Sequence, residues 1–261
     1  MDSVRLTDKH AVEAVLRRNT ALHIYELGDL DDFFWPHTTW YGLGSGPDIR
    51  QVALVYAALD LPVLLAFSDE PDELAALLHL LSPLLPRRVY AHLSPNAAPV
   101  LSGDFAIEPH GHHRKLLLRD SSNLQSIPTD DVVPLSSADA AELAQFYRES
   151  YPDNWFDPRM LDTGCYFATR DKGRLASVAG VHVYSAQYRV AALGNVTTLP
   201  ALRGRGLATR TTARLCKHLL ATADHIGLNV ATDNAPALAC YRRLGFSPVA
   251  EYDELLLTRT R

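Results

Sequence analysis

The feature that most constrains the fold is the segment from Val196 to Ala208, where a strand end, a glycine turn and a helix start follow one another directly. Arg189 to Thr198 is nearly unbroken apolar and β-branched sequence, which predicts a strand buried on both faces, and Pro200 ends it. From Leu207 onward, apolar and small residues recur at helical spacing. The chain is therefore expected to change from strand to helix through the turn at 203–206.

This turn has the properties of an anion cradle. The start of a helix carries unpaired backbone amides and the positive end of the helix dipole, so it favours a diphosphate. Gly204 and Gly206 leave that backbone free of side chains. Arg203 and Arg205 would add positive charge beside it. A plain turn before a helix is the alternative interpretation.

A second pattern follows one helix and one strand later, reading Asn234-x-x-Ala237-x-x-x-Tyr241-x-x-x-Gly245-Phe246. The spacing Arg203-x-x-Gly206-x-Ala208 resembles the acyl-CoA pyrophosphate loop of the GNAT superfamily of N-acetyltransferases, and the second pattern is similar to that family's second cofactor motif. The resemblance covers roughly the C-terminal half of the chain, which is similar to glycine N-acyltransferase-like domains, and it implies acetyl-CoA as acyl donor. The residues it places at the cofactor are Val196, Thr197, Thr198, Leu199, Arg203, Gly204, Arg205, Gly206, Leu207, Ala208, Asn234 and Ala237.

The resemblance also implies how the strand before the loop is used. In the GNAT family this strand splays from its neighbour, so that Val196 to Leu199 would offer backbone groups to pantetheine and to the acyl carbonyl. Gly194-Asn195 is the expected bulge that opens the strand, with close packing at the glycine as the alternative. Asn234 would bridge to the pantetheine arm, serve as a helix N-cap, or do both.

Proton transfer has one candidate acid and no unique base. Tyr241 lies two helical turns after Asn234, and a phenol with a pKa of about 10 can donate to a departing thiolate, so we expect it to be the general acid. Plain core packing is the other interpretation of a buried tyrosine. His182 and Tyr184 share a face of the preceding strand and could point toward an acceptor, although packing roles or a water relay remain open.

Length and a weak internal repeat favour two domains. With 261 residues, we expect a degenerate GNAT-like domain at 1–120, a linker at 121–131 and a catalytic GNAT domain at 132–261. The fold class expected is α/β of the mixed α+β kind, with a mostly antiparallel sheet and two tandem GNAT-like domains. The first domain has Ser68-Asp-Glu-Pro-Asp-Glu73 at the N-terminus of its expected helix Pro71 to Leu81, and these carboxylates would repel a diphosphate.

Composition limits the partners. The net charge of −5 gives no electrostatic footprint for nucleic acid or an anionic membrane, and the first ten residues do not form a secretory signal. Three cysteines without a C-x-x-C pair are typical of a reducing compartment, so a cytoplasmic location is expected. No metal site is expected, because His110-Gly-His-His113 lies in an expected turn without a nearby set of carboxylates.

The sequence thus predicts an acyl-CoA-dependent N-acyltransferase that acts on a small-molecule or peptide amine. A non-catalytic acetyl-CoA-binding sensor or interaction module is a second hypothesis, and a purely structural protein is a third. The acceptor, the acyl chain length and the oligomeric state stay open, because acceptor pockets are built from irregular loops.

Overall fold

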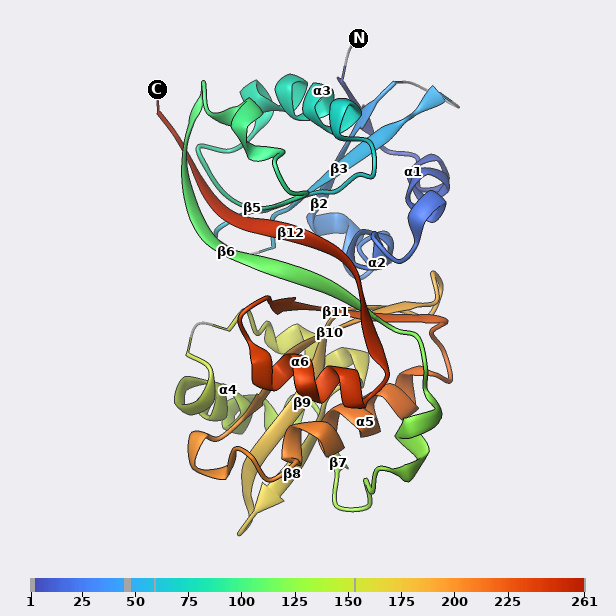
Figure 1. Ribbon diagram of the computed structural model, residues 1–261, viewed down its shortest axis with the longest axis vertical. Coiled ribbons are helices and arrows are strands. Elements are labelled where there is room, and N and C mark those ends of the chain that lie inside the picture. The colour runs from blue at the N-terminus through green and yellow to red at the C-terminus, as the bar shows by residue number, and fades with distance from the viewer. Residues whose placement is uncertain (1–2, 45–47, 59, 153, 261) are drawn as a thin grey trace. The chain divides into compact units, whose positions relative to one another are not determined.

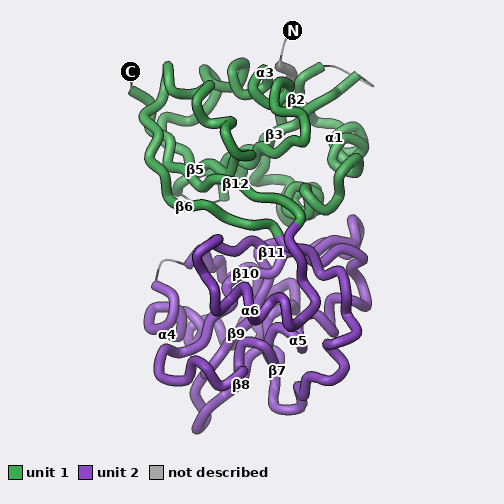
Figure 2. The backbone as a smooth tube through the Cα atoms, viewed as in Figure 1, with its two compact units in different colours: residues 1–115, 249–261 green, residues 116–248 purple. Residues whose placement is uncertain are grey.

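The computed structural model describes residues 3–44, 48–58, 60–152 and 154–260 (Figure 1). The chain divides into two compact units (Figure 2): unit 1 is residues 1–115 with 249–261, and unit 2 is residues 116–248. The end of the chain, 249–261, makes its contacts within unit 1, whereas we expected it in a domain spanning 132–261. Among the described residues, no helix has the length and apolarity needed to cross a membrane.

Unit 1 is built on one sheet with helices packed against it. Its elements are β1 Ser3–Leu6, α1 Lys9–Leu16, α2 Ile24–Gly28, β2 Thr38–Leu43, β3 Gln51–Tyr56, β4 Val63–Ala66, α3 Pro71–Leu81, β5 Arg88–Leu93, β6 Phe105–Leu118 and β12 Phe246–Arg259, the last two of which continue into unit 2. The strand order is β1-β2-β3-β4-β5-β12-β6, and the β4–β5 pair is parallel. Helix α3 buries Leu74, Leu77, Leu78 and Leu81 in the apolar core.

Unit 2 repeats this mixture of helices and strands. Its elements are β7 Val133–Pro134, α4 Ala140–Ser150, β8 Phe167–Asp171, β9 Arg174–Ser185, β10 Val190–Thr198, α5 Leu207–Leu219, β11 His225–Ala231 and α6 Ala235–Arg243. The strand order is β11-β10-β9-β8-β7, in which only β10 and β11 pair in parallel. The expected mixed fold with a mostly antiparallel sheet is confirmed. Short 3-10 helices occur at Arg17–Asn19, Trp35–His37, Ser82–Leu84, Ala98–Leu101, Ser122–Ser126, Ser137–Asp139, Pro158–Thr163 and Pro200–Leu202.

The segment expected as a linker, 121–131, packs along the helices of unit 2. Leu124 is fully buried, and the Lys217 Nζ on α5 donates to the carbonyl of Ile127 at 3.0 Å. Asp131 forms an ion pair with Arg210 at the start of the same helix, 3.0 Å apart. These contacts join the segment to α5, and it is part of unit 2.

Candidate functional site

The sheet of unit 2 opens in the middle of β10. The parallel pairing with β11 joins Val190–Leu193 to His225–Leu228. Both strands are described over their whole length, and they form no further pair after Leu193 and Leu228. On the other edge, the register with β9 shifts between Gly194 and Thr197. The expected bulge at Gly194-Asn195 is therefore present, and it lies where the two parallel strands separate.

Two buried tyrosines hold this bulge. Asn195 has a left-handed backbone, with φ of 55°, and its carbonyl accepts the Tyr147 hydroxyl of α4 at 2.9 Å. The Asn195 Nδ2 donates to the Tyr166 hydroxyl at 3.1 Å, and that hydroxyl donates to the carbonyl of Val181 at 2.9 Å. The Asn195 carbonyl and side-chain nitrogen are both hydrogen-bonded, so the bulge is held at two points, while the buried Oδ1 has no partner among the described residues.

The open edge of β10 presents some amides and not others. The Leu199 N–H donates to the carbonyl of Ala176 at 3.0 Å, so it is used by the pairing with β9. Amide groups of successive residues in a strand point to opposite edges. The backbone groups of Thr198 and Val196 therefore face the open edge, and the carbonyl of Thr198 accepts the Arg203 Nε there at 3.2 Å.

The turn that follows has the geometry of a helix start without a cap. Gly204 and Gly206 have φ of 76° and 74°, in the left-handed region that glycine occupies without strain. The first bond of α5 runs from the Arg210 N–H to the carbonyl of Gly206, 3.1 Å away, so the amides of Leu207 and Ala208 precede it. A Cβ on either glycine would meet no atom within 4 Å, which leaves the approach to these amides open.

Charge around the turn is positive throughout. No Asp or Glu occurs from Lys172 to Ala223, although the whole chain carries a net charge of −5. The Arg203 guanidinium donates to the carbonyls of Thr198 and Ser150 at 3.2 and 3.4 Å, so it ties the turn to the end of α4. Arg205 is exposed and leaves its charge in solvent beside the helix start. An anion at this turn would meet the amides of the helix start and the cations of the turn, while the carboxylate of Asp131 is paired with Arg210 in the first turn of α5.

Helix α6 carries the two candidate residues Asn234 and Tyr241, which differ in exposure and in their contacts. Asn234 is the exposed N-cap of α6, and its side-chain oxygen accepts the Ala237 N–H at 3.2 Å. Tyr241 is 8% exposed, and its ring packs edge-on against Phe246 with centroids 5.9 Å apart. Its hydroxyl makes no hydrogen bond to any described residue. Burial raises the pKa of Tyr241, with Cys240, Tyr151 and Cys216 adding to the rise, so the phenol keeps its proton.

Residues 133–246 match the sequence profile of the acetyltransferase (GNAT) family. This part of the chain is a GNAT domain. No curated protein matches the chain.

Solved structures with the same fold extend over both units. A Drosophila protein has 15% identity and a TM-score of 0.70, with 98% of each chain covered. A GNAT-family protein from Novosphingobium aromaticivorans has 20% identity and a TM-score of 0.60, covering 84% of this chain and 92% of its own. A tandem GNAT protein from the clavulanic acid biosynthesis pathway has 16% identity and a TM-score of 0.56, covering 99% and 98%. At these identities the likeness concerns the fold.

Inside the GNAT domain, two paired glycines each lie directly against an aromatic ring. The sequence analysis did not predict these two contacts. Gly180 of β9 pairs with Gly194 of β10 across the strands. A Cβ on Gly180 would lie 2.2 Å from the Tyr166 ring, and one on Gly194 would lie 2.0 Å from the His182 ring. Gly194 therefore has both expected roles, opening of the strand and close packing. A single glycine inside each of two consecutive apolar strands was the signal available in the sequence.

Helix α3 of unit 1 starts differently from α5. Helix α3 has Glu70 as its N-cap, and Asp72 and Glu73 lie in its first turn. Neither Ser68 nor Asp69 bonds a helical amide, and the Ser68 hydroxyl accepts the Glu70 N–H before the helix begins. Carboxylates at this position stabilise the helix dipole and repel a diphosphate.

The histidine group of unit 1 lies in a strand, and the expectation of a turn there is wrong. His110, His112 and His113 all belong to β6 Phe105–Leu118. Within the described residues, no group of three or more His, Cys, Asp or Glu side chains is arranged to hold a metal ion.

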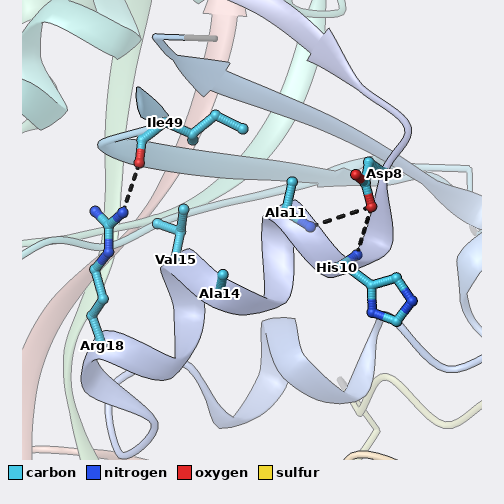
Figure 3. Close-up of a pocket in the computed structure, with 7 residues that line it drawn as sticks. All are labelled: Asp8, His10, Ala11, Ala14, Val15, Arg18 and Ile49. Atoms are coloured by element: carbon cyan, nitrogen blue, oxygen red, sulfur yellow. Dashed lines mark hydrogen bonds between the residues drawn. The ribbon is translucent and has the colours of Figure 1, made fainter. Parts of the chain in front are cut away.

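A pocket of about 480 Å³ lies beside α1 in unit 1 (Figure 3). Its polar groups serve the local structure: Asp8 accepts the N–H groups of His10 and Ala11 at 2.9 and 3.3 Å, and Arg18 donates to the carbonyl of Ile49 at 2.8 Å. The other side chains of the lining are those of His10, two alanines, Val15 and Ile49, so His10 is the one further ionisable group among them. This pocket therefore offers no set of groups for chemistry, and the candidate site is the opened strand and helix start of the GNAT domain.

Proposed function

We propose that the GNAT domain transfers an acetyl group from acetyl-CoA to a primary amine, by direct attack of the amine in a ternary complex. The proposal is supported most by one observation: the open edge of β10 leads directly into the start of α5. That helix start has no side-chain cap, and the segment contains no carboxylate. An extended ligand could place a diphosphate at the start of α5 and an amide-bearing arm along the open edge of β10. Acetyl-CoA has this construction.

The residues divide the work by position. The amides of Leu207 and Ala208, with Gly204 and Gly206 keeping the backbone accessible, would hold the diphosphate. The backbone groups of Val196 and Thr198 would pair with the pantetheine arm and orient the thioester. Transfer from an activated thioester then depends largely on this positioning.

Tyr241 would supply the proton for the departing thiolate. Its phenol stays protonated at neutral pH because burial raises its pKa, and its hydroxyl is not committed to another described residue. Asn234 would support the same surface indirectly, since its side chain caps α6 and so fixes the helix that carries Tyr241.

The acceptor would be a small-molecule or peptide amine, and unit 1 would be a degenerate GNAT-like partner in a tandem arrangement. Support for the tandem comes from the fold shared over 99% of this chain with a tandem GNAT protein. The acidic first turn of α3 supports a single cofactor site per chain. Cys165, Cys216 and Cys240 are free thiols, which fits a cytoplasmic protein.

The test measures CoA release from acetyl-CoA across a panel of amines, with the Tyr241→Phe variant beside the wild type. We expect kcat to fall about a hundredfold while the Kd for acetyl-CoA stays within about twofold, because only the proton donor is lost. Tyr184→Phe is the matched control, since that hydroxyl is bonded to Thr222 at 2.9 Å. An unchanged kcat in Tyr241→Phe would remove this residue from the reaction. Tight acetyl-CoA binding without turnover on any amine would favour the sensor hypothesis.

A further inference from the structure

His182 occupies a special position in the strand that precedes β10. Ala192 pairs with Val183 and Leu193 pairs with Val181, so His182 is an extra residue at a bulge of β9. Its ring lies against Gly194, the first residue of β10 after the last pair with β11. The half-buried imidazole is thus placed next to the point where the parallel strands separate.

The ring lies on the face of the sheet opposite α5. Ser177 of β9 contacts Thr211 of α5, with the two hydroxyl oxygens 3.4 Å apart. Side chains alternate along a strand, so Gly180 faces the other way, and its cross-strand partner Gly194 shares that face. His182 therefore lies on the face that α4 covers and on which Tyr166 also packs.

The segment after α4 continues this face. The Phe156 ring packs against both tyrosines of the bulge, tilted to Tyr147 at a centroid distance of 5.1 Å and edge-on to Tyr166 at 5.8 Å. The end of α4 reaches the cofactor turn, since the carbonyl of Ser150 accepts hydrogen bonds from Thr197 and Arg203. A molecule that approaches the opened strand from this face would pass these residues and His182.

The other ionisable groups facing this region are unsuited to accept a proton near neutral pH. Burial raises the pKa of Tyr147 well above its ordinary value, and it also raises the pKa of Tyr166, so both phenols remain protonated. Asp157 accepts three hydrogen bonds from Arg159. Tyr184 does not face this region: the bulge at His182 places Tyr184 on the other face of the sheet, where its hydroxyl donates to Thr222 after α5, so the expectation that the two side chains share a face is wrong. Strands β9 and β10 carry no carboxylate. Histidine is the side chain that ordinarily titrates between pH 5 and 8.

We propose that His182 accepts the proton of the acceptor amine, an inference that rests on the acetyl transfer proposed above. The imidazole takes one proton from the ammonium form, and the neutral amine then attacks the thioester carbonyl. A C–N bond forms, the C–S bond breaks, and the thiolate takes a proton from Tyr241. The second amine proton leaves the nitrogen as the amide forms and restores the Tyr241 phenol through solvent, while His182 releases its own proton to solvent.

The experiment compares His182→Gln and His182→Ala with Tyr184→Phe, over about pH 5.5 to 9, using the amine that the wild type acetylates best. We expect kcat/KM for the amine to fall about a hundredfold at neutral pH in both His182 variants, and the titration that limits the wild type at acidic pH to disappear. Added imidazole should restore part of the activity of His182→Ala, because the ring leaves a space on Gly194. The Kd for acetyl-CoA should stay within about twofold.

Two results would overturn this inference while leaving acetyl transfer intact. One is a wild-type pH profile and kcat/KM in His182→Gln, and the other is a weakening of acetyl-CoA binding that accounts for the entire loss of activity. Should His182→Ala fail to fold, His182→Gln and His182→Asn carry the same comparison, with thermal unfolding as the check on folding. Failure of the proposed function is a different outcome: the wild type itself would then release no CoA with any amine.

Discussion

A carboxylate placed at residue 206 tests the cofactor site by charge alone. Gly206 has φ of 74° and no atom near its Cβ position, and asparagine and aspartate are the side chains that best tolerate this conformation. Gly206→Asp and Gly206→Asn therefore have nearly the same shape and differ by one charge. A carboxylate about 6 Å from one charge of a diphosphate would cost about 1 to 3 kcal/mol for an effective dielectric constant of about 80 to 20.

This difference corresponds to a Kd for acetyl-CoA about fivefold to a hundredfold weaker in Gly206→Asp than in Gly206→Asn. Stability should change in the opposite sense, because a carboxylate at a helix start interacts favourably with the dipole by about 0.3 to 1 kcal/mol. Calorimetric titration at low and high salt measures the first quantity, and urea unfolding measures the second. Screening should narrow the gap in Kd at high salt.

Equal Kd values for the aspartate and asparagine variants at low salt would show that no diphosphate binds near residue 206. A loss of affinity that follows a loss of stability would also contradict the reasoning, because the charge is expected to affect the two properties in opposite directions.

Two further predictions concern stability. Gly180→Ala should lower the free energy of unfolding by about 1 to 3 kcal/mol, because the new methyl group would lie 2.2 Å from the fully buried Tyr166 ring; Gly103→Ala, with nothing within 4 Å, should stay within about 0.5 kcal/mol in the same urea experiment. Asp29→Asn should stabilise the protein at pH 7 and lose that advantage near pH 4. Burial, with Glu26 nearby, raises the pKa of Asp29 in the folded state. The protonated Asp29 side chain therefore contributes its full stability below the unfolded pKa, and this contribution is lost as the pH rises through the folded pKa. Equal urea midpoints for the two proteins at pH 7 would refute this.

Local sequence was sufficient for the centre of the site. Arg189 to Thr198 and the helix from Leu207 were predicted within a residue of β10 and α5, because a β-branched run, a proline and paired glycines restrict the backbone locally. The bulge at Gly194-Asn195 could be predicted for the same reason. Asn234 was expected to serve as a cap or as a cofactor contact, and its bond to Ala237 shows that it does cap the helix.

Features that depend on distant contacts could not be derived in this way. Nothing in the sequence near 249–261 indicates that this segment pairs with β5, where Leu255 lies opposite Ala91. The bulge at His182 likewise results from the register between β9 and β10. Because β9 is buried on both faces over most of its length, its apolar residues do not reveal a one-residue shift. The contact of the His182 ring with Gly194 can be derived only when that register is known.

The two units show why a shared arrangement of helices and strands does not by itself create a cofactor site. Both have two parallel strands connected by a helix, β4 and β5 by α3, and β10 and β11 by α5. In unit 1 the strand leads through Ser68, Asp69 and Glu70 into a helix with acidic first residues, whereas in unit 2 it leads through left-handed glycines into a helix free of acids. The fold supplies the helix dipole in both cases, and the turn residues decide whether an anion can reach it.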